Sequence, residues 1–303
     1  MNIRAVNILN TKLLIVATVQ QWRARDLADN TLRDWHIRSS LGFDIPTIPT
    51  TINHVRWWTP QEHAARLLTS GYPLTLQAPP PDWLATLPAH TTKREIWTGT
   101  IETLHTAPTE PLWWKPATIK HPRLPATLCT RDTIQQWAEN ETSNGHNINE
   151  LILQGTSPVE WTSETRCWIL NKQVIGASTY LHQPRPDTPA NIWSSPTFPH
   201  HTFSTTENSA AEWCQQLLNT DTITAPDGAV IDIGHNPETG HSIIEANPAW
   251  ASAWYGTPAS TVIRTVDAAG EPNPRWSWQP DPHLLTTAEQ KRPLPTGGNL
   301  TTP

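Results

Sequence analysis

The chain has few charged residues. Only 16 % of its 303 residues are charged, the formal net charge is -6, and Lys and Arg do not gather into a block anywhere in the sequence. Because a basic patch or stripe is the electrostatic footprint of nucleic-acid binding, we expect neither a nucleic acid nor an anionic membrane surface as a partner. The hydrophobic content of 37 % is enough for a folded chain.

Cysteine and long apolar runs are also scarce. Cys129, Cys167 and Cys214 are widely spaced and form no Cys-x-x-Cys pair. This argues against a disulfide framework or a zinc knuckle and favours reduced thiols in a cytoplasmic protein. No stretch reaches the roughly 18 apolar residues that a membrane span needs. The run from Leu13 to Val19 is too short for a signal peptide and predicts a buried strand.

Tryptophan and proline are abundant instead, with 17 and 30 residues. We interpret most tryptophans as bulky core residues, with a ligand or partner surface as the alternative. The segment 182–204 is rich in proline and has no hydrophobic period, and a loop of this length is more often functional or disordered than a plain connection. No internal repeat is present, and the length allows one large or two modest domains.

Three helices are predicted from start and stop signals, within 59–71, 130–140 and 209–219. Thr59 is the expected N-cap of the first, and Ser209 of the third, each with an acidic residue three positions later that completes a capping box. The clearest strand signal is a hairpin, with strands at 161–170 and 174–180 around a turn at 171–173.

The stretch VIDIGHNPETGHSIIEANPAW, residues 230–250, places an acidic residue in each of two apolar runs. Since side chains alternate along a strand, Glu245 is expected to share a face with Ile243 and Asn247. If HNPETG turns the chain back, Asp232 and Glu245 lie nearly opposite each other. Like charges in that position are destabilising unless a cation lies between them. Carboxylate and amide oxygens suit Mg²⁺, so the pair predicts a magnesium site.

Two other interpretations of this stretch stay open. Asp232 and Glu245 are equally compatible with solvated positions on the outer face of an ordinary hairpin. A zinc site made by His235 and His241 is a third interpretation, but no His-Glu-x-x-His or His-x-His spacing accompanies these residues.

Two upstream segments add cationic groups. Lys115 stands between Trp114 and Pro116 in an apolar strand, where its ammonium either reaches solvent along a packed stem or meets a phosphate. Glu164 and Arg166 fall on one face of a strand, where they form either a surface ion pair of little energetic value or part of a site.

Together, these segments resemble the ATP-grasp superfamily, and in particular its short, divergent proteins predicted to be amide-forming ligases. The resemblance rests on WWKPATIK, VEWTSETRCWIL and VIDIGHNPETGHSIIEANPAWASAWYG, in this order, and covers roughly residues 90 to 265. It implies an α+β, ATP-grasp fold, with two α+β subdomains clamping ATP and a smaller N-terminal α/β region before them. The implied divisions are 1–105, substrate-side region; 106–265, ATP-grasp domain; and 266–303, C-terminal extension with a frayed tail.

The resemblance also implies which residues bind the nucleotide. By their match to the family's motifs, Lys115 and Lys120 contact the ATP phosphates, Leu153 and Gln154 offer groups to the adenine, and Glu160 takes the ribose hydroxyls.

The catalytic and metal-binding residues follow from the same resemblance. Arg166 is expected near the transferred phosphoryl group and the substrate carboxylate, where it and Lys115 neutralise developing charge. The Mg²⁺ ligands are expected to be Asp232, Glu245 and Asn247.

The implied activity is an ATP- and Mg²⁺-dependent carboxylate-amine ligase that forms an amide or peptide bond through an acyl phosphate. Its partners would be small-molecule or peptide carboxylates and amines, with the proline-rich loop and its Arg185, His200 and His201 as a lid. One alternative is an ATP-grasp protein that binds ATP or transfers a phosphoryl group for another purpose; another is a non-enzymatic, Trp-rich interaction protein. The missing Walker motif excludes only the P-loop class. The sequence leaves the substrates and the oligomeric state open.

Overall fold

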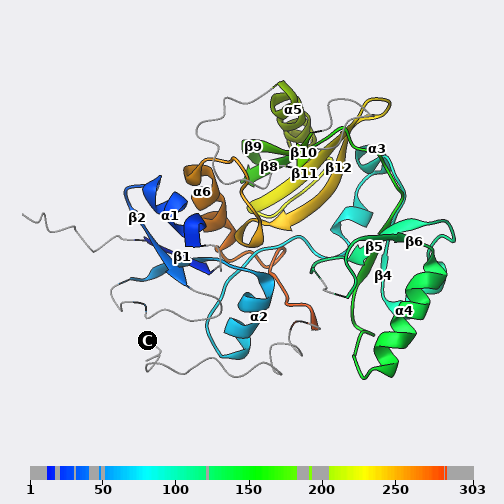
Figure 1. Ribbon diagram of the computed structural model, residues 1–303. Helices are drawn as coiled ribbons and strands as arrows, with labels where there is room; N and C mark the ends of the chain where they lie inside the picture. The colour runs from blue at the N-terminus through cyan, green and yellow to red at the C-terminus, as the bar shows by residue number, and fades with distance from the viewer. Residues whose placement is uncertain are drawn as a thin grey trace, which may run out of the picture.

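The computed structural model describes residues 12–17, 21–30, 32–40, 48, 52–120, 123–182, 191–192, 205–282 and 284. Within these ranges the chain forms three sheets, each packed against helices (Figure 1). Most of the proline-rich segment, namely 183–190 and 193–204, lies outside the described residues, as does the C-terminal tail at 291–303. No helix of the described part is long and apolar enough to cross a membrane.

The N-terminal region is a small α/β unit. Its parallel sheet has the order β2-β1-β3, and its elements are β1 (Lys12–Ala17), α1 (Gln21–Asp29), β2 (Trp35–Ser40), β3 (His54–Trp58) and α2 (Gln61–Thr69). Strand β1 lies in the centre, and the buried strand predicted for this apolar run is confirmed. Its continuous apolar sequence follows from burial on both faces, as is usual for parallel sheets.

A four-stranded antiparallel sheet follows, in the order β4-β7-β5-β6. Its strands are β4 (Ile96–Gly99), β5 (Leu112–Pro116), β6 (Thr127–Cys129) and β7 (Leu153–Thr156). Helix α4 (Arg131–Ser143) and the 3-10 helix η3 (Ile101–Thr106) cover one face, where Trp114 and Leu153 pack against Ile134. The opposite face carries Trp113 and Lys115, because side chains alternate along β5. That face is left for the site.

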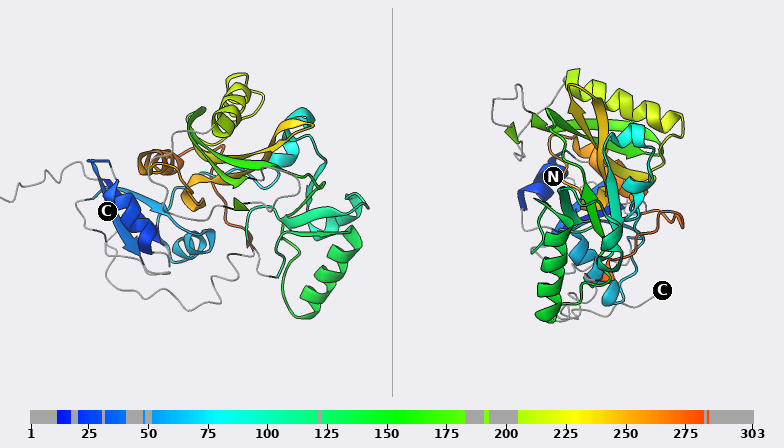
Figure 2. Two further views of the ribbon diagram at one scale, coloured as in Figure 1. Left: turned by 45° about the horizontal axis from the view of Figure 1, so that its top comes forward. Right: turned by 90° about the vertical axis from the view of Figure 1, so that its right-hand side faces the viewer.

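The third sheet is antiparallel, in the order β10-β9-β8-β11-β12. Its strands are β8 (Ser163–Leu170), β9 (Gln173–His182), β10 (Asn191–Ile192), β11 (Gly228–Asn236) and β12 (Gly240–Pro248). Helix α5 (Thr205–Asn219) covers one face, and α6 (Ala259–Ala269), with the 3-10 helix η4 (Ala249–Ala251), covers the other (Figure 2). The hairpin of β8 and β9 is the one that the sequence predicts. Two further short helices, η2 (Trp83–Thr86) and α3 (Ala89–Thr92), lie in the connection to β4.

A β-bulge in β12 corrects one expectation. Asp232 pairs with Glu245, as predicted, but the next residue, Ile233, pairs with Ile243, so that Ile244 is an extra residue in β12. Ile243 therefore faces the core under α5 with Ile233, on the side of the sheet opposite Glu245. A bulge of this kind breaks the two-residue alternation that the sequence argument assumed.

The helix starts are partly as expected. Thr130 caps α4 through its side chain, as predicted. Helix α2 instead has Pro60 at its N-cap and no side-chain cap, because the Thr59 hydroxyl is hydrogen-bonded to Nδ1 of His63. Helix α5 begins at Thr205, one turn before the predicted cap at Ser209. Helix α6, which the sequence analysis did not predict, packs a fully apolar stripe against the third sheet.

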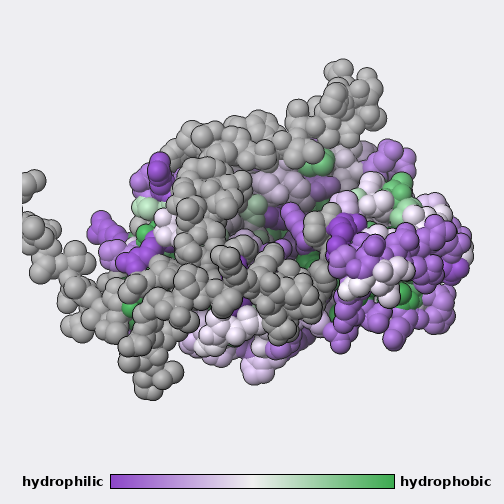
Figure 3. Space-filling model, turned by 60° about the horizontal axis from the view of Figure 1, so that its bottom comes forward, coloured by the Kyte–Doolittle hydropathy of each residue, from purple (hydrophilic) through white to green (hydrophobic). Residues whose placement is uncertain are grey.

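The tryptophans are mostly core residues in the described part of the chain. Nine are buried, and Trp114, Trp168 and Trp250 are among the largest fully buried side chains. On the face shown in Figure 3, hydrophilic residues dominate the described surface and hydrophobic ones appear only as small patches. Trp113, at 43 % exposure, is an exception. This supports the interpretation of tryptophan as packing material, with Trp113 as a candidate for contact with a ligand.

One carboxylate connects the N-terminal sheet to α6. Asp267 accepts hydrogen bonds from Lys12 at 3.0 Å, from Arg56 at 3.0 Å and from the ring of His54 at 2.6 Å. Burial raises the pKa of Asp267, but the bonds from Lys12 and His54 outweigh it and bring that pKa below its ordinary value. The ionised carboxylate thus stabilises the contact between the N-terminal unit and the third sheet's helix.

Asp267→Asn is expected to lower the free energy of unfolding by about 2 kcal/mol at pH 7, because it leaves two cations without their counter-charge. A group with a lowered folded-state pKa contributes stability above its unfolded-state pKa and loses it as pH falls through the folded-state value. The difference between wild type and variant should therefore shrink below about pH 4. Urea titrations at several pH values measure it, with Asp221→Asn, whose side chain is 64 % exposed, as the control. A difference that does not change with pH would contradict the assignment.

Candidate active site

Four charged side chains meet between the four-stranded and the five-stranded sheets. Lys115 comes from β5, Arg166 from β8, Asp232 from β11 and Glu245 from β12. Ladder pairing places Asp232 beside both Arg166 and Glu245. The sequence predicts all four as site residues, and the fold brings them together. The cluster is neutral as a whole, because two cations face two carboxylates.

The Arg166–Asp232 pair is the most buried part of this cluster. Nε and Nη2 of Arg166 donate to the two carboxylate oxygens of Asp232, at 2.8 and 2.7 Å, and Nη1 donates to the carbonyl of Ala253 at 2.9 Å. Asp232 is 0 % exposed, and burial raises its pKa although Arg166 opposes that shift. Burial would lower the pKa of Arg166, but Asp232 raises it well above the ordinary range. A bidentate pair of this type is geometrically specific.

Glu245 lies at the edge of the buried pair and meets Lys115. The two side chains form an ion pair, and Nδ2 of Asn247 donates to Glu245 at 2.8 Å and to Asp232 at 3.3 Å. Burial alone would raise the pKa of Glu245, but Lys115 and Asn247 hold it well below its usual range. The three predicted metal ligands therefore share one face of the hairpin, with the nitrogen of the Asn247 amide toward the carboxylates.

Two tyrosines border Arg166 on its remaining side. The guanidinium carbon lies 5.5 Å from the ring centre of Tyr180 and 4.9 Å from that of Tyr255, and the two rings stack at 4.7 Å. Tyr255 has a φ of 47°, a left-handed conformation that is rare for a bulky residue. The stacked rings restrict the guanidinium to the orientation in which its fork faces Asp232.

Glu164 does not form the ion pair with Arg166 that the sequence spacing allowed. Arg166 pairs with Asp232 instead, since the guanidinium points across the ladder to β11 rather than along β8. Burial raises the pKa of Glu164, and the carboxylates of Asp232 and Glu245 raise it further, whereas a hydrogen bond from Tyr180 lowers it.

A cavity of about 330 Å³ opens between the two sheets beside the cluster. Lys115, Gln154 and Trp113 line it from the four-stranded sheet, and Glu164 lines it from the five-stranded sheet. Lys115 and Gln154 are ladder partners, so their side chains leave the sheet on the same face. The cavity thus joins a cation, a buried amide and an exposed aromatic ring in one place.

The other predicted nucleotide residues lie elsewhere. Leu153 is fully buried in the core under α4, and its side chain points away from the cavity. Glu160 and Lys120 are exposed and do not line this cavity. The roles that the resemblance assigns to these three residues stay predictions.

Arg94 is a site residue that the sequence analysis missed. Its Nη1 and Nη2 donate to the carbonyls of Ile243 and Ile244, both at 2.7 Å, at the bulge that sets the position of Glu245. Its guanidinium lies 5.6 Å from the ring centre of Trp161, and burial lowers its pKa to about 10. Nothing in the KRE stretch around Arg94 distinguishes it from a solvated surface run, so the sequence held no usable signal.

Trp161 approaches the sheet at a glycine. A Cβ at Gly234 would lie 2.5 Å from the Trp161 ring, so this position of β11 must stay without a side chain if the ring is to line the cavity.

The two histidines of the hairpin have other partners. His235 is hydrogen-bonded to the Thr162 hydroxyl at 3.1 Å, and His241 to that of Ser209. Among the described residues, neither belongs to a group of three potential metal ligands. This geometry gives no support to the zinc interpretation.

A family model confirms the resemblance. The model, described as an ATP-grasp domain and the second family of its clade, matches residues 92–265, more than half of the chain. The chain belongs to this ATP-grasp family. The expected α+β fold with a preceding α/β region is thereby confirmed, and the four-stranded and five-stranded sheets are the two halves of the ATP-grasp domain. The matched range begins just before β4, while the predicted division at 105/106 stays a prediction.

The solved structures similar to this ATP-grasp chain share little sequence with it. A RimK-domain ATP-grasp protein from Sphaerobacter thermophilus is 14 % identical, with a TM-score of 0.43 and coverage of 86 % of this chain and 97 % of that one. The D-alanine-D-alanine ligase from Coxiella burnetii is 11 % identical, with a TM-score of 0.45 and coverage of 86 % and 95 %. D-cycloserine synthetase is 12 % identical, with a TM-score of 0.44 and coverage of 92 % and 99 %. No curated protein matches the chain.

Arg166→Met is expected to destabilise the protein by about 3–5 kcal/mol, because it leaves the Asp232 carboxylate buried without a counter-charge. Urea unfolding followed by circular dichroism measures the change. Lys172→Met is the matched control, since Lys172 forms an exposed pair with Asp221 at the end of the same strand. It should change stability by less than about 0.5 kcal/mol. Similar losses in both variants would show that the buried pair has no special role.

Arg94→Met is expected to remove the donors of two bulge carbonyls and to cost about 2 kcal/mol. The sharper readout is hydrogen exchange, in which amides of β12 should exchange faster while those of β9 stay protected. Arg275→Met, whose guanidinium contacts Thr224 and the Trp276 ring, is the control. Unchanged exchange at residues 243–246 would exclude Arg94 as the group that fixes the bulge.

Proposed function

We propose that this ATP-grasp protein is an ATP- and Mg²⁺-dependent carboxylate-amine ligase. The observation that supports the proposal most directly is the pairing of Lys115 with Glu245 beside the pairing of Arg166 with Asp232, at the mouth of a cavity between the two sheets. Opposite charges that hold one another in place are suited to exchange partners when a polyanion and a divalent cation enter together. The three free thiols fit a reducing compartment, so we place the protein in the cytoplasm.

In this proposal ATP occupies the cavity between the sheets. The triphosphate meets Lys115, which leaves Glu245 for it, and the adenine lies toward the buried amide of Gln154 with the exposed ring of Trp113 as a stacking surface. Base stacking on an aromatic ring and a lysine on phosphate together are a common basis of nucleotide affinity.

The residues present fit Mg²⁺. Two carboxylates and one amide on one face are hard oxygen donors, and Mg²⁺ usually takes one or two carboxylates together with substrate phosphates. Asp232, Glu245 and Asn247 would hold the ion, with the Asn247 amide turned so that its oxygen replaces the nitrogen that now faces the carboxylates. When bound, Mg²⁺ supplies charge neutralisation on the phosphates.

The chain's own residues then position and neutralise. An oxygen of the substrate carboxylate attacks the γ-phosphorus as the bond to the bridging oxygen breaks, which gives ADP and an acyl phosphate. The amine nitrogen attacks the acyl carbon, phosphate leaves with the electrons of the carbon–oxygen bond, and the nitrogen loses a proton. Lys115 offsets the charge that develops on the phosphoryl oxygens, and Arg166 keeps Asp232 ionised and fixed in orientation.

Titration calorimetry with ATP in the presence and absence of Mg²⁺ tests the first half of the proposal. Wild type should bind ATP more tightly with Mg²⁺, and Lys115→Met and Glu245→Gln should each weaken binding about tenfold or more. Lys120→Met, a change at an exposed lysine of the same segment, should stay within about twofold, which also tests whether Lys120 contacts phosphate. Absence of ATP binding in the wild type would reject the proposal.

Mass spectrometry tests the second half. The protein is incubated with Mg²⁺-ATP and pools of amino acids and peptides, and ADP, phosphate and new amides are measured beside the Glu245→Gln variant. A ligase gives one amide for each ADP and phosphate. A stable phosphorylated product without an amide would favour the other phosphoryl-transfer role.

A further inference from the structure

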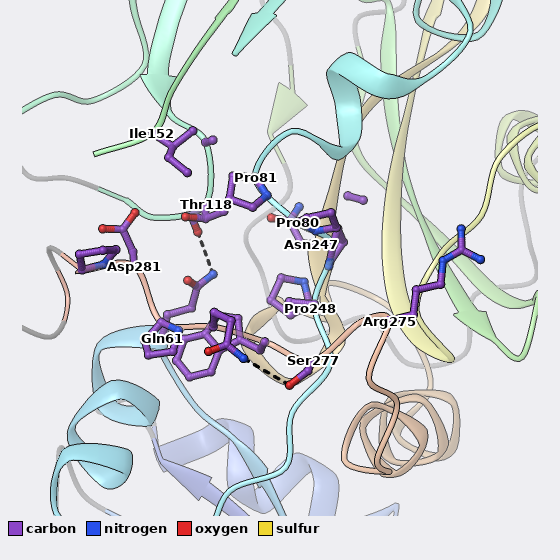
Figure 4. Close-up of a pocket in the computed structure, with 18 residues that line it drawn as sticks. Gln61, Pro80, Pro81, Thr118, Ile152, Asn247, Pro248, Arg275, Ser277 and Asp281 are labelled. Carbon is purple, nitrogen blue, oxygen red and sulfur yellow. Dashed lines mark hydrogen bonds between the residues drawn. The ribbon is translucent and has the colours of Figure 1, made fainter. Parts of the chain in front are cut away.

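A second cavity, of about 240 Å³, lies where three parts of the chain meet (Figure 4). Gln61 comes from α2 of the N-terminal unit, Thr118 and Ile152 come from the segments that flank β5 and β7, and Asn247 comes from β12. Residues 275–282, which follow the matched ATP-grasp range, close it. The cavity is therefore built largely by parts of the chain outside the family match.

This cavity continues the proposed ATP cavity along the same strands. Ala117 lies two residues after Lys115, and Ile152 two residues before Gln154, and each pair divides between the two cavities. Asn247, which contacts both carboxylates of the charged cluster, lines the second cavity itself. A ligand in the second cavity would thus lie on the other side of the charged cluster from the nucleotide base.

The wall of this cavity is poor in hydrogen-bond donors. Six of its lining residues are prolines, which have no backbone N–H group: Pro79, Pro80, Pro81, Pro248, Pro280 and Pro282. The side-chain amide of Gln61 donates to the carbonyl of Thr118 at 2.8 Å, which leaves its oxygen as the group that a ligand can address. Trp278, packed on Trp250, adds an apolar surface. The wall therefore offers carbonyl oxygens and apolar surface and few groups that could bind an anion.

The charged residues agree with this polarity. Arg275 lines the cavity, but its guanidinium donates to the Thr224 hydroxyl at 2.9 Å and lies over the Trp276 ring, and in Figure 4 it points away from the other labelled side chains. Asp281 is the other charged lining residue, is only 8 % exposed, and points toward Thr118 and Ile152. A buried carboxylate disfavours an anion and favours a cation or a strong donor.

We propose that this second cavity binds the amine substrate, and that this substrate is a primary amine with an apolar body. The inference rests on the proposed ligase function and gives it a substrate class. The ammonium group binds toward Asp281 and the oxygen of Gln61, and the apolar body lies on the prolines and Trp278. Asn247 places the amine next to the cluster at which the acyl group would be activated, and the carboxylate substrate is not the occupant of this cavity.

Ligand-detected NMR titration tests the assignment with three matched probes that differ only in their end group: phenethylamine, 2-phenylethanol and 3-phenylpropanoate. Wild-type protein, with a non-hydrolysable ATP analogue and Mg²⁺, should bind phenethylamine about tenfold or more tightly than 3-phenylpropanoate, with the alcohol between them. Asp281→Asn should remove most of this preference for the amine. Arg275→Met is the control and should change neither affinity by more than about twofold.

A second variant keeps the test valid if Asp281→Asn does not fold. Ala117→Leu adds volume to the cavity and should abolish binding of the amine while the ATP analogue binds as before, measured by calorimetry on the same samples. A wild type that binds 3-phenylpropanoate more tightly, or that binds neither charged probe while it binds the ATP analogue, overturns the amine assignment alone. Amine binding that survives both Asp281→Asn and Ala117→Leu overturns it as well. Failure to bind the ATP analogue instead rejects the underlying ligase proposal.

Discussion

The fork of Arg166 on Asp232 is the interaction on which the rest of the site depends. A carboxylate without solvent exposure, placed in the middle of a five-stranded sheet, is tolerable only with a cation that satisfies both oxygens, and Arg166 does so from the neighbouring strand. Its charge and direction are then fixed before any ligand arrives. Glu245, two strands from Arg166, is left to Lys115, which belongs to the other half of the domain. One strong pair within a sheet thus leaves one exchangeable pair between the two sheets.

The exchangeable pair requires that Glu245 stand opposite Asp232, and this depends on the bulge at Ile244. Arg94 binds the two carbonyls at that irregularity, so a residue from the segment before β4 determines the geometry of β12. The same segment crosses from one half of the domain to the other. Movement of the two sheets relative to each other would therefore act on the metal-ligand face through Arg94 as well as through Lys115.

Much of this arrangement was predictable from the sequence, for reasons that can be named. Asp232 and Glu245 lie in two apolar runs around a turn, and that pattern defines both the hairpin and the pairing of the two acids. Ile243 was assigned to the wrong face because a bulge leaves no mark in an apolar run. The partner of Arg166 was missed since strand pairing between β8 and β11 links residues 66 positions apart. Arg94, α6 and the proline-lined cavity depend on packing between distant segments, which no local period encodes.

The cysteines have a consequence for handling the protein. Cys167 on β8 and Cys214 on α5 are buried in contact with each other, and this contact, with burial, raises the pKa of Cys167 well above the ordinary thiol value. Cys129, the third thiol, lies half-buried on β6, and burial raises its pKa too. Because thiolates are the reactive form, air oxidation of the native fold is slow at all three. The unfolded chain has no such protection, so refolding calls for a reductant that the folded protein can do without.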